Sequence, residues 1–183
     1  MPPQGVLLVT GLPATGKTTV ARALAYALAV PMLAKDGIKE PLLELLGAAD
    51  MAASRRLSDA SFAALFALAR EQLAAVGAVV LEGNFRPGEH EPALRALLAH
   101  SACQCTQVLC RVAEPLRQAR LKARGTDASR HPGHRDAEWV SAAGTAGDGF
   151  LQIEGPRFIH DGAMVEPVHG SALIRSLANR QLV

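Results

Sequence analysis

The segment GLPATGKT at residues 11–18 constrains this chain more than any other part of its sequence. It fits the pattern G-x-x-x-x-G-K-[ST], in which a glycine-rich backbone wraps around phosphate groups. The apolar segment GVLLVT at 5–10 precedes it, and a helical pattern rich in Ala and Leu follows over 17–29 and ends before Pro31. A strand, this loop and a helix in that order are the context in which the pattern binds phosphate. We therefore expect a strand–loop–helix unit with a phosphate site at the start of its helix.

The residue types in this loop suit a nucleoside triphosphate. Gly11 and Gly16 let the backbone curl so that its N–H groups point inward, and the helix N-terminus adds partial positive charge. Lys17 is expected to reach the β- and γ-phosphates, and the Thr18 hydroxyl is expected to bind Mg²⁺. We therefore predict that ATP with Mg²⁺ is the ligand. The expected nucleotide-binding residues are Gly11, Leu12, Pro13, Ala14, Thr15, Gly16, Lys17, Thr18 and Thr19.

Strand-like and helix-like segments alternate along the rest of the chain. Short apolar runs predict strands at 5–10, 30–34, 78–81, 105–112 and 157–161. Helical patterns occupy 17–29, 38–46, 59–76, 89–100, 114–124 and 171–180. The helix at 59–76 takes Ser58 as its candidate N-cap and ends before Gly77. This alternation predicts an α/β fold, with a parallel sheet covered by helices on both faces, in one domain over residues 1–183.

Polar residues gather where the predicted strands end. They are residues 15–19, Asp36, residues 82–86 and Asp161. Ligands of parallel sheets bind beyond the carboxyl ends of the strands. We therefore expect these residues to meet at one rim of the sheet.

Composition excludes several partners. The formal net charge of +2 and the 4% of aromatic residues disfavour a nucleic acid partner. No apolar run is long enough to span a membrane, and no basic segment precedes the first apolar one, so we expect a cytoplasmic protein. Cys103, Cys105 and Cys110 lack Cys-x-x-Cys spacing and are expected to be reduced, mostly buried thiols.

Four segments together resemble a family. These are GLPATGKTT, MLAKDGIKEPLLELLG, VVLEGNFRP and ARLKAR…RHPGHRD, which cover most of residues 5–135. They are similar to small bacterial P-loop kinases of an AAA-type ATP-binding group. That group is related to chloramphenicol phosphotransferase, zeta toxins, gluconate and shikimate kinases and polynucleotide kinases. The resemblance implies a three-layer α/β/α sandwich, a five-stranded parallel sheet in the order 2-3-1-4-5, and a mobile lid at about 125–149. The Asn-Lys-x-Asp element of GTPases does not occur in the chain.

Asp36 is the candidate general base, because the resemblance places a carboxylate at the end of the second strand beside the acceptor hydroxyl. A carboxylate there can orient the hydroxyl and take its proton as the O–P bond forms. Lys35 and Lys39 are expected to position Asp36 or an anionic substrate. The alternative is that Asp36 only caps a helix that begins near Gly37.

Glu82 ends the third predicted strand, where a carboxylate can hold Mg²⁺ through water or bind the acceptor. The alternative is a structural, salt-bridged Glu82. The resemblance places Asn84 and Arg86 on the acceptor side, and Arg86 is a candidate anchor for a carboxylate or phosphate of the substrate, against the alternative of an ordinary surface arginine.

Arg117, Arg120 and Arg124 share one face of a predicted helix that, in the kinases this chain resembles, leads into the lid. The resemblance implies that lid arginines neutralise charge on the transferring phosphoryl group, which favours Arg120, Arg124 and Arg130. His131 and His134 in RHPGH are expected to meet phosphates or the acceptor rather than a metal, because the intervening Pro-Gly prevents a regular helix.

These observations predict a kinase that transfers the γ-phosphoryl group of ATP to a hydroxyl of a small metabolite or antibiotic. Two alternatives stay open: a polynucleotide 5′-hydroxyl kinase, and a nucleotide-dependent switch without an acceptor. The helices at 38–46 and 59–76 are mostly Ala and Leu and do not indicate which acceptor is used. The sequence does not indicate an oligomeric state.

Overall fold

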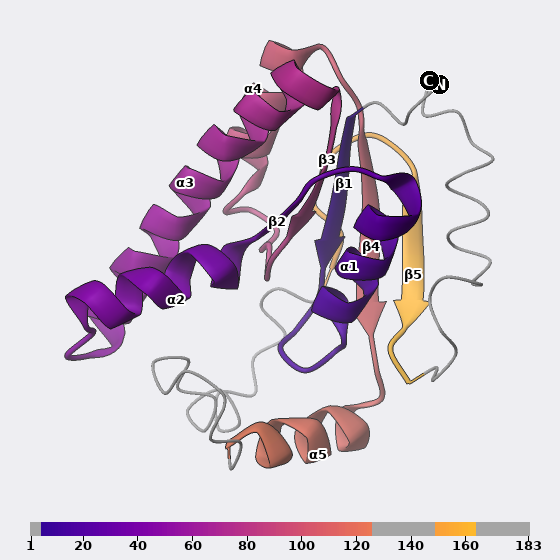
Figure 1. Ribbon diagram of the computed structural model, residues 1–183. Helices are drawn as coiled ribbons and strands as arrows, with labels where there is room; N and C mark the ends of the chain where they lie inside the picture. The colour runs from indigo at the N-terminus through magenta and orange to yellow at the C-terminus, as the bar shows by residue number, and fades with distance from the viewer. Residues whose placement is uncertain (1–4, 126–148, 164–183) are drawn as a thin grey trace.

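The computed structural model describes residues 5–125 and 149–163, which form a five-stranded parallel sheet with helices on both faces (Figure 1). The strands are β1 (Gly5–Thr10), β2 (Met32–Ala34), β3 (Ala78–Glu82), β4 (Cys105–Arg111) and β5 (Arg157–Asp161). The helices are α1 (Lys17–Leu28), α2 (Lys35–Leu46), α3 (Met51–Val76), α4 (Glu91–Ser101) and α5 (Glu114–Gly125). The strands pair in the order β2-β3-β1-β4-β5, and every pair is parallel. The predicted architecture and strand order are confirmed.

Alternating side chains of the central strands build two separate cores. Val6 and Leu8 of β1 face one side of the sheet, where they pack with residues of α3 and α4. Leu7 and Val9 face the other side and pack with α1. Because successive side chains of a strand point to opposite faces, an uninterrupted apolar strand fills both cores at once. This explains why the short run GVLLVT occupies the centre of the sheet.

Two helices begin earlier than the sequence pattern predicts. Helix α3 begins at Met51 rather than 59, and Asp50 caps it by accepting a hydrogen bond from the Ala53 backbone N–H at 2.7 Å. Ser58 therefore lies inside the helix, and its prediction as an N-cap is wrong. Helix α2 begins at Lys35, which places Asp36 in its first turn, so the alternative that Asp36 caps a helix starting near Gly37 is wrong as well.

The remaining predicted elements agree with the structure to within two residues, apart from the helix at 171–180, which lies outside the described residues together with most of the lid. Cys105 and Cys110 are buried, Cys103 is half-buried, and all three are free thiols, as expected. Within residues 5–125 and 149–163, no helix combines the length and the apolar character needed to cross a bilayer.

The carboxyl ends of the strands meet at one edge of the sheet, as predicted. Figure 1 shows the strand arrows pointing to the end of the molecule where α5 lies. The phosphate loop follows β1, Lys35 and Asp36 follow β2, and Glu82 is the last residue of β3. Asp161 ends β5, and its carboxylate accepts a hydrogen bond from the Ala163 backbone N–H at 2.9 Å, so it closes a turn.

Candidate active site

The phosphate loop has the backbone conformation that its glycines predict. Gly11 has φ +146°, and a Cβ atom at this position would overlap the carbonyl oxygen of Cys110 in β4. Gly16 has φ +87° and immediately precedes α1. The Thr15 hydroxyl donates a hydrogen bond to the Leu12 carbonyl at 2.9 Å and closes the loop. These contacts fix the shape of the loop, and the start of α1 supplies its positive end.

Arg120 contacts the backbone of the phosphate loop and does not line the cavity among the described residues. Its guanidinium donates to the Gly162 carbonyl at 2.9 Å and to the Ala14 carbonyl at 3.5 Å. Gly162, which follows β5, approaches the loop so closely that a Cβ atom there would overlap the Thr15 carbonyl oxygen. Arg120, predicted to bind the nucleotide directly, thus contacts the backbone of the loop and connects it to the end of the sheet.

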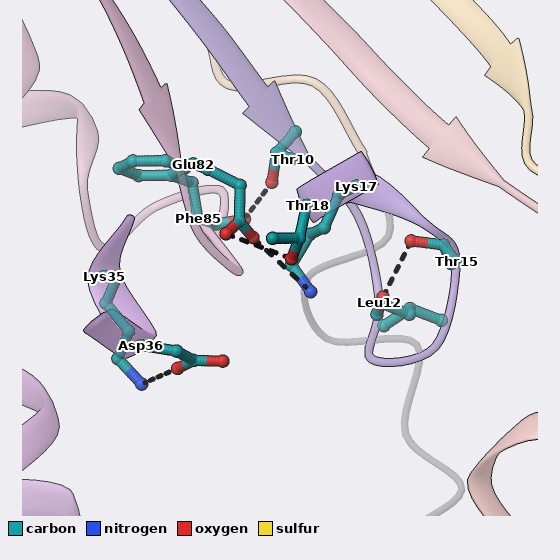
Figure 2. A network of polar contacts seen from close by, with 9 residues as sticks. All are labelled: Thr10, Leu12, Thr15, Lys17, Thr18, Lys35, Asp36, Glu82 and Phe85. Carbon is teal, nitrogen blue, oxygen red and sulfur yellow. Dashed lines mark hydrogen bonds and ion pairs between the residues drawn. The ribbon is translucent and has the colours of Figure 1, made fainter. Parts of the chain in front are cut away.

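A second cluster joins the start of α1 to the end of β3 (Figure 2). Thr18 Oγ1 donates to Glu82 Oε2 at 3.2 Å, and Lys17 Nζ lies 3.9 Å from Glu82 Oε1. The side chain of Glu82 is 3% exposed. Burial raises the pKa of Glu82, against the lowering effects of Lys17 and of the Thr18 hydrogen bond. Thr18 and Glu82, which were each predicted to serve Mg²⁺, are thus in contact with each other, and Glu82 also has the ion pair that its structural alternative expects.

The pair Thr18 and Glu82 suits Mg²⁺. A hydroxyl and one carboxylate are hard oxygen ligands, and Mg²⁺ in nucleotide sites keeps several waters and takes few protein ligands. Burial raises the pKa of the Glu82 carboxyl and so disfavours its ionised form. A bound cation would lower this pKa again, because it stabilises the carboxylate. In the described part of the chain, no group of three or more His, Cys, Asp or Glu side chains is arranged around a common metal position.

A cavity of about 380 Å³ opens beside this cluster. Its walls come from the phosphate loop, the start of α1, α2, the first half of α3, the segment after β3 and the end of α5. The predicted residues that line it are Pro13, Ala14, Gly16, Lys17, Thr18, Thr19, Lys35, Asp36, Lys39, Asn84, Arg86 and Arg124. Gly11, Leu12, Thr15, Glu82 and Arg120 do not line it among the described residues. The phosphate loop and the candidate base thus border the same space.

Asp36 faces this space with Lys35 beside it. Lys35 Nζ donates to Asp36 Oδ1 at 3.1 Å, and Lys35 is buried, whereas the Asp36 side chain is 42% exposed (Figure 2). The Lys35 ammonium also lies 5.9 Å from the centre of the Phe62 ring. Lys35 therefore orients the Asp36 carboxylate, as predicted, and leaves it accessible to a ligand in the cavity.

The arginines predicted around the site differ in their contacts. Arg86 lines the cavity and forms an ion pair with Glu89 at 3.1 Å. Arg124 also lines the cavity, whereas Arg117 is buried against Glu114, with two hydrogen bonds of 2.7 Å. The Arg117 and Gln118 side chains hold the pKa of Glu114 at about 2. Arg124 is thus the arginine of α5 that reaches the cavity. Arg130, His131 and His134 lie outside the described residues.

Lys39, a predicted substrate-binding residue, has an unusual environment in the cavity wall. Its ammonium donates to Ser54 Oγ of α3 at 2.9 Å, and both side chains are buried. Burial, and next the neighbouring Lys35, lower the pKa of Lys39 to about 8, while Asp36 and Asp59 act in the opposite direction. The charged form of Lys39 is therefore held at the expense of folding stability.

Replacing Lys39 with methionine should accordingly raise the Tm of the ligand-free protein by about 3–6 °C near pH 7. The folded pKa of about 8 lies below the ordinary value of 10.5, so the unfolded chain binds more protons between these pH values. Wild-type stability at this position therefore increases as pH rises from 8 to 10.5, and the advantage of the variant shrinks there. Thermal unfolding of both proteins from pH 6.5 to 10.5 measures this difference in Tm. The exposed Lys122→Met in α5 is the control, and a lower Tm for Lys39→Met at pH 7 would contradict the assignment.

Sequence reasoning missed one wall of the site. The cavity is also lined by Met51, Ala52, Ser54, Arg55, Ser58, Asp59, Phe62 and Glu89. Most of these belong to the first two turns of α3, before residue 59, which the sequence pattern had left outside a helix. The signal was Asp50, because Asp-x-x-Ala with a following helical run is as good an N-terminus as the one placed at Ser58.

Three features define a small P-loop kinase fold. They are the parallel sheet in the order 2-3-1-4-5, the phosphate loop after the central strand, and a carboxylate after β2 that lines the same cavity as this loop. The family described as "AAA domain" (AAA_33) matches residues 6–142, and the chain belongs to that family. No curated protein matches the chain.

Solved structures resemble the chain over almost its whole length. A provisionally assigned kinase from Chloroflexus aurantiacus J-10-fl is 28% identical, with a TM-score of 0.84 and 98% of each chain covered. The APS kinase of Mycobacterium tuberculosis, solved with AMPPNP and APS, is 19% identical, with a TM-score of 0.58 and coverage of 98% of this chain and 100% of that one. A gluconokinase from Sinorhizobium meliloti 1021 is 16% identical, with a TM-score of 0.54 and coverage of 97% and 93%. The resemblance to small P-loop kinases is confirmed.

Proposed function

We propose that this protein is an ATP-dependent phosphotransferase that transfers the γ-phosphoryl group to a hydroxyl of a small molecule. The observation that carries the proposal is that Lys17 and Asp36, from the first turns of α1 and α2, line one cavity. A phosphate cradle and an accessible carboxylate on the same space are what phosphorylation of a hydroxyl requires. The APS kinase structure with AMPPNP supports ATP as the donor.

In this reaction the acceptor oxygen forms a bond to Pγ, and the bond between Pγ and the oxygen bridging to the β-phosphate breaks. ADP leaves with that electron pair, and the hydroxyl proton passes to the Asp36 carboxylate. Lys17 and Arg124, which line the cavity, stabilise negative charge on the transferring group. Lys35 holds Asp36 in orientation through its 3.1 Å hydrogen bond.

Thr18 and Glu82 are the residues that would hold Mg²⁺. When bound, the ion neutralises charge on the β- and γ-phosphates. The Glu82 carboxylate also accepts the Thr18 hydroxyl hydrogen bond and lies near Lys17, so it keeps both groups at the start of α1 in position.

The test is a panel of small alcohols, hydroxy acids, sugars and hydroxylated antibiotics, each incubated with ATP, Mg²⁺ and the wild-type protein. Product is identified by mass spectrometry, and ADP release is followed in parallel. We expect at least one acceptor to gain one phosphoryl group, and Lys17→Met to abolish it. ATP hydrolysis that no acceptor stimulates would instead indicate a nucleotide-dependent switch. A phosphorylated oligonucleotide would indicate a polynucleotide kinase.

A further inference from the structure

The far wall of the cavity contains two buried polar side chains from different helices. Lys39 lies one helical turn after Lys35 and Asp36, so these residues project from the same side of α2. Ser54 lies in the first turn of α3, which packs against α2. The hydrogen bond between Lys39 Nζ and Ser54 Oγ therefore sits inside the wall, and both residues line the cavity.

The described residues give the cavity an excess of positive charge. Six cationic side chains and three carboxylates line it. The cations are Lys17, Lys35, Lys39, Arg55, Arg86 and Arg124. The carboxylates are Asp36, Asp59 and Glu89. The nucleotide phosphates account for Lys17, but Lys39 and Arg55 lie on α2 and α3, away from the phosphate loop.

Lys39 differs from Lys35 and Arg86 in the kind of partner that its cationic group contacts. Lys35 is paired with Asp36, and Arg86 is paired with Glu89, each at 3.1 Å. The hydrogen-bond partner of Lys39 within the described residues is a neutral hydroxyl. A buried ammonium opposite a neutral group is unfavourable unless negative charge arrives, and the depressed pKa of Lys39 reflects this. A ligand oxyanion would supply the missing charge.

We propose that Lys39 and Ser54, with Arg55 at the opening, form an oxyanion subsite, so that the acceptor of this kinase is an anionic hydroxy compound. This inference rests on the proposed phosphotransferase function and names its substrate class. The oxyanion is a carboxylate or a phosphate, because both accept hydrogen bonds from an ammonium and a hydroxyl. Neutral sugars and alcohols bring no further negative charge to Lys39 and are poor acceptors.

The spacing on α2 also limits the size of the acceptor. Asp36 and Lys39 are three residues apart, which places their Cβ atoms on the order of 5–6 Å from each other. The reacting hydroxyl lies at Asp36 and the oxyanion at Lys39. Because both residues also line one cavity of about 380 Å³, we expect the two groups to belong to one small molecule.

The test uses matched pairs of compounds that differ in the oxyanion: gluconate and glucitol, glycerate and glycerol, glycerol 3-phosphate and glycerol. Each is titrated by calorimetry into the protein with saturating AMPPNP and Mg²⁺, and then assayed with ATP. We expect the anionic member of a pair to bind and to be phosphorylated, and the neutral member to do neither. The carboxylates and the phosphate ester distinguish the two sources of the oxyanion.

Variants assign the effect to the subsite. Lys39→Met should raise the Kd and KM of the anionic acceptor about 10²-fold, with kcat changed far less, because it removes a buried charged partner of the ligand. Lys39→Arg should restore part of the affinity. Arg55→Met should weaken binding less, and the neighbouring exposed Arg56→Met, which does not line the cavity, should leave it unchanged.

The outcomes separate the two proposals. Anion binding that depends on Lys39 without any phosphorylation overturns the kinase proposal and leaves the subsite. Phosphorylation of a neutral compound as efficiently as its anionic counterpart, or binding of the anion unchanged in Lys39→Met, overturns the subsite and leaves the kinase. Absence of binding by every anionic member also overturns the subsite. A structural role for Lys39 predicts instead that Lys39→Met lowers Tm, with no change in the Kd of the acceptor.

Discussion

Asp36→Asn should reduce kcat by roughly 10²–10⁴ while ATP affinity stays close to wild type. Asparagine keeps the shape of the side chain but cannot take the acceptor proton. Asp36 lines the cavity from α2, whereas the proposed triphosphate site is the loop before α1, so the substitution should leave the donor site unaltered. Steady-state kinetics with an acceptor identified by the panel, and calorimetry with AMPPNP, measure the two quantities separately.

The control for this variant is Asp50→Asn. Asp50 caps α3, asparagine caps helices equally well, and Asp50 does not line the cavity among the described residues. Its kcat should match wild type. If Asp36→Asn retained near-normal turnover, Asp36 would not be the general base, and the proposed proton transfer to its carboxylate would be wrong.

Lys17→Met should lower kcat by about 10³-fold or more, with a smaller loss of nucleotide affinity. The motif places the ammonium of Lys17 against the β- and γ-phosphates, and its benefit is greatest when negative charge develops in the transition state. Methionine keeps the aliphatic length of the side chain, so the loop and the start of α1 keep their packing. Single-turnover measurements with saturating ATP separate the chemical step from binding, and turnover within about tenfold of wild type would contradict the role.

The 3.9 Å contact between Lys17 and Glu82 adds a second expectation. Removing Lys17 leaves the buried carboxylate of Glu82 without its nearest cation, so Lys17→Met should also lower Tm. The double variant Lys17→Met/Glu82→Gln should recover the Tm but not the activity. This pattern separates the loss of stability from the loss of activity, and the single variant Glu82→Gln measures how much activity is lost through the proposed Mg²⁺ site alone. A double variant that recovered activity would show that Lys17 acts only by balancing Glu82.

The phosphate loop, the proposed site of the phosphoryl donor, was predictable because consecutive residues form it. The motif at 11–18 specifies a phosphate cradle, and the apolar run at 5–10 specifies the strand before it. Strand order followed from the family resemblance, since alternation alone predicts a parallel sheet without its order. Asp36 and Glu82 were predicted at the rim because both stand at the end of a strand, where ligands of parallel sheets bind.

The acceptor side was harder to predict because its residues come from two helices that meet only in three dimensions. Lys39 and Ser54 are 15 positions apart, and their contact depends on α3 starting at Met51. The predicted helix at 59–76 left Ser54 and Arg55 outside any helix. The two predicted helices at 38–46 and 59–76 consist mostly of Ala and Leu, which do not indicate a polar site. Periodicity describes the apolar face of a helix well and its polar face poorly.

Arg117, Arg120 and Arg124 show a related limit. Their spacing predicted one shared face on α5, and nothing in that pattern distinguished their roles. In the structure, Arg120 contacts the phosphate loop backbone, Arg124 reaches the cavity and Arg117 is paired with Glu114. The separate roles arise from what lies opposite each residue, which a helical pattern does not contain.

The register of β2 with β3 places Ala34 opposite Glu82, so the start of α2 is tied to the sheet. The proposed oxyanion subsite lies instead on the second turn of α2 and at the start of α3, which residues 47–50 connect. Substitutions at Lys39, Ser54 or Arg55 can therefore change which acceptor fits while the spacing of Asp36 and Lys17 stays constant. A scaffold divided in this way is well suited to evolutionary change of specificity, and to its redesign in the laboratory, without rebuilding the phosphoryl-transfer machinery.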